Sequence, residues 1–170
     1  MTLEELNALA EPDARVAFER CCGAGAWVTR MTARRPYRAV NHLLGIAHTY
    51  WMQLGPDDWR EAFAHHPRIG DLLSLQRRFG ATADLARREQ ASVAAASRVV
   101  LQALADGNRA YEERFGYIFI VFATGRSAEE MLALLRDRLG NDPETELKVA
   151  AKEQWKIMRL RLDTMLGGPR

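Results

Sequence analysis

The chain has 170 residues, 48% of them apolar and 27% charged, and its 24 basic and 22 acidic residues give a formal net charge of +2. This composition is typical of one globular domain, and so small a charge argues against nucleic acid as a partner, because proteins that bind phosphate backbones carry a marked basic excess. The longest apolar run, residues 117–123, is much shorter than the ~20 residues that cross a bilayer, so no membrane partner is expected.

The cysteines, the histidines and the two ends of the chain indicate a cytoplasmic protein without a metal. Cys21 and Cys22 are adjacent, and adjacent cysteines rarely reach disulfide geometry, so we expect free thiols in a reducing compartment. The histidines lack the spacing of a zinc site. The first residues are acidic where a secretory signal is basic, and the last residues are not a peroxisomal signal.

Start and stop signals place the helices of the N-terminal third. The capping box Thr2-x-x-Glu5 predicts the start of a first helix, and Pro12-Asp13 suits the start of a second. Gly23 and Gly25 interrupt the pattern that follows. Apolar residues at helical spacing then predict a helix over residues 37–54.

The middle of the chain contains its most conspicuous loop. A brief helix over 57–64 leads into residues 65–71, where a proline and a glycine disfavour regular structure. A helix is then predicted over 82–104. Asp106-Gly107-Asn108 is expected to end it, and a further turn is expected over 108–114.

Two more helices are predicted near the C-terminus. The capping box Ser127-x-x-Glu130 opens one, which Gly140 ends. Asp142-Pro143 opens the last, whose apolar residues continue to about Leu166. Together the patterns predict an all-α, single-domain helical bundle of about seven to nine helices that occupies residues 1–170.

Residues 117–122, Tyr-Ile-Phe-Ile-Val-Phe, do not follow a helical pattern. Their β-branched and aromatic side chains favour extended backbone, yet the sequence offers no second strand for pairing. Two alternatives stay open. Composition alone favours a short apolar helix in the core, whereas a buried extended segment would leave backbone N–H and C=O groups for a polar ligand.

His66 and Glu89 are candidates for acid–base chemistry. His66 precedes a proline, which holds its backbone extended on the loop, and an imidazole exchanges protons near neutral pH. The alternative is a solvated loop histidine.

Glu89 shares a helix face with Leu85 and Val93, where a carboxylate is costly unless paired. The alternative is a position at the rim of the apolar stripe.

Arg161 is the third candidate, because it shares a helix face with Met158 and Met165. A half-buried arginine requires an anionic partner, such as Glu89, a helix C-terminus or a bound carboxylate. A structural salt bridge is an equally supported alternative. With His66, these residues indicate a cofactor-free acid–base site for a small anionic molecule.

Several runs of residues, in order along nearly the whole chain, are shared with a known family. They are His66-Pro67-Arg68-Ile69-Gly70-Asp71, Glu89-Gln90-Ala91, Asn108-x-x-Tyr111-x-x-x-Phe115-Gly116-Tyr117-x-Phe119-Ile120, Ala123-Thr124-Gly125-Arg126-Ser127, Asn141-Asp142-Pro143, Glu146-Leu147 and Lys156-Ile157-x-x-x-Arg161-Leu162. The chain thereby resembles the 2-oxo-4-hydroxy-4-carboxy-5-ureidoimidazoline (OHCU) decarboxylases of ureide metabolism.

The resemblance implies an all-α fold and the last step of urate degradation, in which the ureide OHCU loses CO2 to give (S)-allantoin without a metal or organic cofactor. It implies that His66 is the catalytic proton donor and that Glu89 and Arg161 complete the polar site. A homodimer is expected by analogy with the family. The resemblance also implies a ligand pocket lined by Pro67, Ala86, Arg87, Arg88, Glu89, Gln90, Phe119, Ile120, Val121, Phe122 and Ala123. With the resemblance, the predicted helical bundle therefore includes a short extended segment near residues 117–123.

Two positions depart from the family pattern. The family commonly has serine where this chain has Ala86 and often cysteine where it has Phe122. A side-chain hydrogen bond to the ligand is therefore expected to be absent or replaced by one from the backbone.

Two other functions are alternatives to the decarboxylase. One is a catalytically inactive helical protein that binds ureides or acts as a scaffold, and the other is a metal-dependent hydrolase that uses the histidines.

Overall fold

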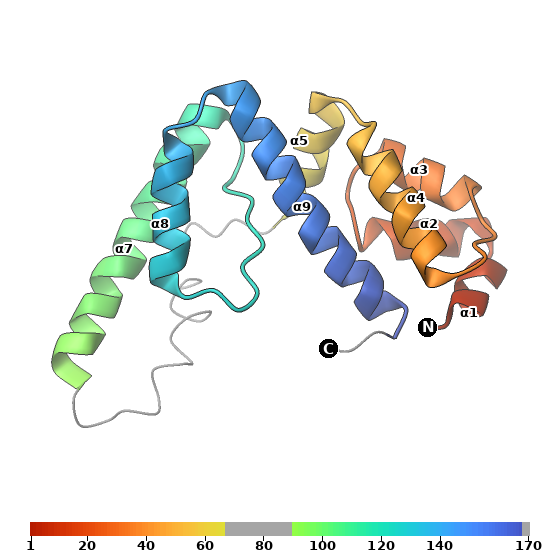
Figure 1. Ribbon diagram of the computed structural model, residues 1–170, viewed down its shortest axis with the longest axis horizontal. Coiled ribbons are helices and arrows are strands. Elements are labelled where there is room, and N and C mark those ends of the chain that lie inside the picture. The colour runs from red at the N-terminus through yellow and green to blue at the C-terminus, as the bar shows by residue number, and fades with distance from the viewer. Residues whose placement is uncertain (67–89, 168–170) are drawn as a thin grey trace. The chain divides into compact units, whose positions relative to one another are not determined.

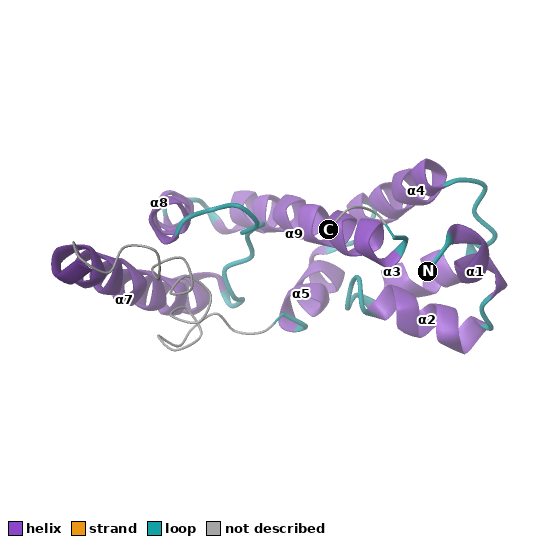
Figure 2. Cartoon of the chain, turned by 90° about the horizontal axis from the view of Figure 1, so that it is seen from below, coloured by secondary structure: helices purple, strands orange, loops and turns teal. Residues whose placement is uncertain are grey.

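The computed structural model describes the backbone of residues 1–66 and 90–167, and the side chains of residues 1–66 and 98–167. Within these ranges all regular structure is helical, which confirms the predicted all-α class. None of the described helices has the length and apolar character needed to cross a membrane. The helices, shown in Figures 1 and 2, are α1 (Leu3–Ala8), α2 (Glu11–Glu19), α3 (Gly25–Ala33), α4 (Val40–Met52), α5 (Pro56–Ala64), α7 (Gln90–Phe115), α8 (Ala128–Leu139) and α9 (Pro143–Met165).

The chain divides into two compact units. The first contains residues 1–66 and 149–170, and the second contains residues 67–148. Helix α9 contributes its first residues to the second unit and the remainder to the first. The expectation of a single domain over residues 1–170 stays a prediction.

Both capping boxes form as the sequence predicts. At the start of α1, Thr2 Oγ1 accepts from the Glu5 backbone N–H at 3.1 Å, and Glu5 Oε2 accepts from the Thr2 N–H at 2.8 Å. Ser127 and Glu130 make the same pair of bonds at the start of α8. Each cap satisfies N–H groups that a helix start leaves unpaired, and such caps are worth roughly 0.5–2 kcal/mol.

Helix α3 was not predicted, because its start was interpreted only as an interruption by glycines. Its Trp27, Val28 and Met31 side chains are fully buried, and the Trp27 indole donates to the Ala47 carbonyl of α4 at 3.0 Å. Short helices gain most of their stability from burial of such a face rather than from local propensity. Gly25 is the first residue of this helix, and burial of this face outweighs its poor propensity.

Helix α4 buries the stripe that the spacing predicts, namely Leu43, Ala47 and Trp51. The Trp51 indole donates to the carbonyl of Ala151 at 2.9 Å, which joins α4 to the part of α9 that belongs to the first unit. Tyr37 precedes the helix instead of starting it and donates from its hydroxyl group to the Met31 carbonyl at 2.7 Å. These contacts join α3, α4 and α9 within the core of the first unit.

In the second unit, α7 runs without a break through Gly107, so the predicted stop at Asp106-Gly107-Asn108 is wrong. A Cβ atom added at Gly107 would lie closer to Leu135 Cδ2 than real Cβ atoms approach other atoms. The glycine therefore lets α8 pack tightly on α7. A glycine inside a helix costs roughly 0.5–1 kcal/mol relative to alanine, and the close packing offsets this cost.

Residues 118–123 are neither helix nor strand, so the short helix that composition favours is wrong. The reason is the direction of the helices: Gly107 lies beside Leu135 and Arg114 donates to the Asn141 carbonyl, so α7 and α8 run in the same direction (Figure 1). The chain between parallel helices must return along their length. Six extended residues span ~20 Å, whereas six helical residues span only ~9 Å.

Candidate active site

The structure describes some of the predicted site residues and leaves others outside its range. His66 and Arg161 lie in the first unit, and the segment 119–123 lies in the second. Gln90 begins α7, with its side chain outside the described set. The remaining predicted site residues lie outside the described residues, and these are Pro67, Ala86, Arg87, Arg88 and Glu89.

His66 lies just beyond the end of α5, where its N–H donates to the Phe63 carbonyl at 3.1 Å. Its Nε2 atom is buried and has no hydrogen-bond partner within the described ranges. Burial lowers the pKa of His66 below its ordinary value of 6.5, and the nearby Arg161 guanidinium lowers it further, while the Gln154 side chain acts in the opposite direction. The neutral imidazole is therefore favoured.

Arg161 faces the interior, as the helical spacing predicts, whereas the neighbouring Arg159 is exposed. Its Nη1 donates to the Cys21 carbonyl at 3.2 Å, just past the C-terminal end of α2. Of the alternatives for its partner, a helix C-terminus is present, whereas Glu89 lies outside the described residues. No carboxylate of residues 1–66 or 98–167 pairs with Arg161. Within those ranges this bond uses only one of the five N–H groups of the guanidinium.

His65, the neighbour of His66, is held by local structure. Its Nδ1 lies 2.9 Å from the Glu61 carbonyl in the preceding helical turn. Its ring also packs against Gly23 so closely that a Cβ atom at residue 23 would collide with it. These contacts distinguish the two imidazoles, because His65 is paired and His66 Nε2 is not, within the described ranges.

Cys21, whose carbonyl binds Arg161, and its neighbour Cys22 are free thiols, as expected. Burial raises the pKa of Cys21 to about 11 and that of Cys22 to about 12. Both thiols therefore stay protonated and unreactive at neutral pH. Across the described part of the chain, no group of three or more His, Cys, Asp or Glu side chains is placed to hold a metal ion.

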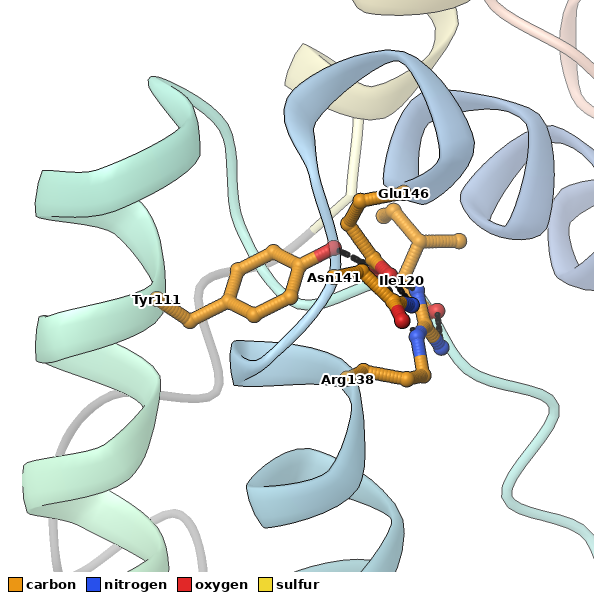
Figure 3. Close-up of polar contacts among 5 residues, drawn as sticks. All are labelled: Tyr111, Ile120, Arg138, Asn141 and Glu146. Carbon is orange, nitrogen blue, oxygen red and sulfur yellow. Dashed lines mark hydrogen bonds and ion pairs between the residues drawn. The ribbon is translucent and has the colours of Figure 1, made fainter.

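A buried ion pair in the second unit joins α8 to the start of α9 (Figure 3). Arg138 donates from Nε and Nη2 to Glu146 Oε1 at 2.8 and 2.5 Å, and the Glu146 side chain is 0% exposed. The Tyr111 hydroxyl donates to the same oxygen, and Asn141 Nδ2 donates to the other at 2.7 Å. Burial and the Glu146 hydrogen bond raise the pKa of Tyr111, which keeps the phenol protonated as a donor.

The same arginine holds the non-helical segment 118–123. Arg138 Nη1 donates to the Ile120 carbonyl at 2.7 Å (Figure 3). The guanidinium also lies over the Phe119 ring, 4.6 Å from its centroid. Sequence reasoning missed this network. The signal was present, because Arg138 follows Met131 and Leu135 at the helical spacing that singled out Arg161.

The comparisons with known proteins identify the family. The family model described as OHCU decarboxylase matches residues 7–163. The chain belongs to the OHCU decarboxylase family. This result confirms the resemblance seen in the sequence motifs.

Individual members of the OHCU decarboxylase family and a solved structure give the extent of the similarity. The uric acid degradation bifunctional protein TTL of Arabidopsis thaliana is 36% identical over 146 residues, which are 84% of this chain and 44% of that protein. The OHCU decarboxylase of Haloferax volcanii is 24% identical over 165 residues, 95% of this chain and 94% of that protein. This chain therefore spans less than half of the Arabidopsis relative.

The fold of this OHCU decarboxylase family member is similar to a crystal structure of OHCU decarboxylase in the presence of (S)-allantoin. The TM-score is 0.70 and the identity 34%, and the match covers 88% of this chain and 96% of the other. The all-helical architecture described above is thus the fold of that OHCU decarboxylase.

Proposed function

We propose that the chain catalyses the cofactor-independent decarboxylation of OHCU to (S)-allantoin and CO2, the last step of urate degradation to allantoin. The observation that carries this proposal is the family match over residues 7–163. The likeness to a structure obtained in the presence of (S)-allantoin supports it, because that molecule is the product of the proposed reaction.

The proposed reaction needs little beyond orientation and one proton. The C–C bond to the carboxylate breaks, CO2 leaves, and the electron pair passes into the conjugated C=N group of the ring, so no organic cofactor is required as an electron sink. A proton then joins the carbon that bears the ureido group, while the hydroxyl group on the neighbouring carbon becomes a carbonyl and its proton is balanced by one gained at the ring nitrogen. Delivery of the proton to one face of the carbon gives a single enantiomer.

His66 is the proposed proton donor. Its lowered pKa favours the neutral imidazole. A substrate carboxylate placed near the ring would raise that pKa again, because a nearby negative charge favours the protonated form. Binding of the anionic substrate would thereby favour uptake of a proton from solvent by the imidazole, which then holds the proton that the reaction consumes.

Arg161 and Glu89 are proposed to complete the polar site. The Arg161 guanidinium is half-buried and fixed by the Cys21 carbonyl, so its other N–H groups suit an anionic or carbonyl oxygen of the substrate. For Glu89, which the family resemblance supplies, two roles stay open: it accepts from ureido N–H groups or it holds the imidazole.

The segment from Phe119 to Ala123 is proposed to bind the ureide through its backbone. Residues 119–121 are buried, and Arg138 anchors the Ile120 carbonyl, which suits a rigid set of peptide groups. The resemblance supplies further pocket residues, which are Pro67, Ala86, Arg87, Arg88 and Gln90. A homodimer and a cytoplasmic location also belong to this proposal.

A coupled assay tests the proposed activity. Urate is oxidised by uricase and processed by hydroxyisourate hydrolase, and circular dichroism follows the appearance of (S)-allantoin with and without this protein. We expect the protein to accelerate this signal above the spontaneous decay of OHCU and above a heat-inactivated control. A ureide-binding or scaffold protein would instead bind allantoin with no acceleration, and that outcome would refute the decarboxylase function.

A further inference from the structure

Gln154 is a fully buried polar residue that the motifs do not single out. Its side chain is 0% exposed, and neither the nitrogen nor the oxygen of its carboxamide has a hydrogen-bond partner among the residues that the structure describes. Buried amides are normally paired, because an unpaired one loses its bonds to water without replacement. A buried carboxamide in this state is therefore a candidate for a role outside simple packing.

The position of Gln154 connects it to the proposed site. Gln154 and Arg161 are seven residues apart on α9, so they share one face of the helix, since seven residues complete about two turns. The Gln154 side chain adjoins the His66 imidazole, whose Nε2 is buried and likewise without a partner in the described ranges. The two side chains lie close to each other without reaching full hydrogen-bond geometry.

The groups that face the His66 imidazole act on it in opposite directions. Arg161, from α9, and His65, from the end of α5, both disfavour the protonated ring. The Gln154 carboxamide favours it. Among the described residues, Gln154 is thus the one neighbour that supports the imidazolium form that a proton donor must adopt.

We propose that Gln154 is a positioning residue of the active site, whose carboxamide pairs with Nε2 of His66 and supports the imidazole in both of its protonation states. This inference rests on the proposed role of His66. A carboxamide suits such a partner because it offers both an acceptor and a donor. The carboxamide oxygen accepts a hydrogen bond from the protonated imidazole, and the NH2 group donates one to the neutral imidazole. A carboxylate could only accept, so it would serve the protonated imidazole alone.

The test is an NMR titration of the His66 ring in the wild type and in Gln154→Met, with His66→Asn used to assign the resonance. We expect Gln154→Met to lower the proton affinity of His66 by about threefold or more, because one hydrogen bond to the charged ring is lost. Gln154→Glu is expected to raise it. Gln102→Met, which alters an exposed glutamine bonded to Asp106, is the matched control and should leave the titration unchanged.

Kinetics and stability separate positioning from packing. We expect Gln154→Met to lower kcat about tenfold with KM within about twofold, and to leave Tm unchanged or higher, because an apolar side chain of similar size needs no partner. An unchanged His66 titration in this variant would show that Gln154 only fills the core, whatever happens to the rate.

The wild type provides a second measurement that needs no folded variant. The side-chain amide resonance of Gln154 should shift with pH at the midpoint of the His66 titration, and a pH-independent amide would overturn the inference. These titrations require no turnover. A wild type without decarboxylase activity would therefore refute the proposed function, while the pairing of Gln154 with His66 would still be decided by NMR.

Discussion

Arg138→Met tests whether the ion pair in the second unit holds the non-helical segment in place. The substitution leaves Glu146, which is 0% exposed, without its cation and leaves the Ile120 carbonyl without its charged donor. Removing one partner of a buried ion pair costs ~3–5 kcal/mol, because the remaining charge stays buried and uncompensated. At ~2–4 °C per kcal/mol for a chain of this length, we expect Tm to fall by about 6–20 °C.

The assay for Arg138→Met combines thermal unfolding with kinetics. Unfolding is followed by circular dichroism, with Arg136→Met, an exposed arginine of the same helix, as the control that should change stability by no more than ~0.5 kcal/mol. Below the Tm of the variant, we expect KM for OHCU to rise about tenfold because the segment 118–123 is no longer held by Arg138. This factor corresponds to a loss of ~1.4 kcal/mol of binding free energy.

A double variant checks the physical reason for the loss. Arg138→Met combined with Glu146→Gln removes the uncompensated charge, so it should be more stable than Arg138→Met alone. The reasoning would be refuted if Arg138→Met lost less than ~1 kcal/mol, or if it were no less stable than the Arg136→Met control.

Three further predictions concern the imidazoles and the helix contact. His66→Ala should abolish most decarboxylation with little change in Tm, whereas His65→Ala should leave the rate nearly unchanged; equal losses of rate would mean that the wrong imidazole has been assigned. A proton donor is active when protonated, so kcat/KM should fall as pH rises through the lowered pKa of His66, with a midpoint below 6.5. A rise over that interval would indicate a base instead. Gly107→Ala should destabilise the protein by ~1–3 kcal/mol in denaturant unfolding, because its methyl group collides with Leu135; a stabilised variant would contradict the packing argument.

Helix starts were predictable because their signals are local. The capping boxes at Thr2 and Ser127 place donor and acceptor within one turn of chain, so the same residues that carry the signal form the bonds. The stop predicted at Gly107 failed for the opposite reason. A glycine often ends a helix because its backbone is conformationally free. At residue 107 the glycine instead leaves room for the Leu135 side chain, and Leu135 is remote in sequence.

In the candidate site, too, local signals were predictable and contacts between remote residues were not. Helical spacing alone indicated that Arg161 faces inward, and the structure agrees, but its partner at Cys21 lies 140 residues away in the chain. Arg138 carries the same spacing signal as Arg161, but its partners Glu146 and Ile120 come from other segments of the chain. Gln154 is an ordinary polar residue on a helix, and only its burial makes it informative.

The helical class, most helix starts and the family are readable from the amino-acid sequence, because caps, periodicity and ordered motifs are properties of the chain read in order. The return of residues 118–123 between parallel helices, the contact of Arg138 with them and the closeness of Gln154 to His66 depend on the folded arrangement. The physical reason is that the energy of a buried polar group depends on which atoms replace water around it, and folding brings those atoms together from distant parts of the chain.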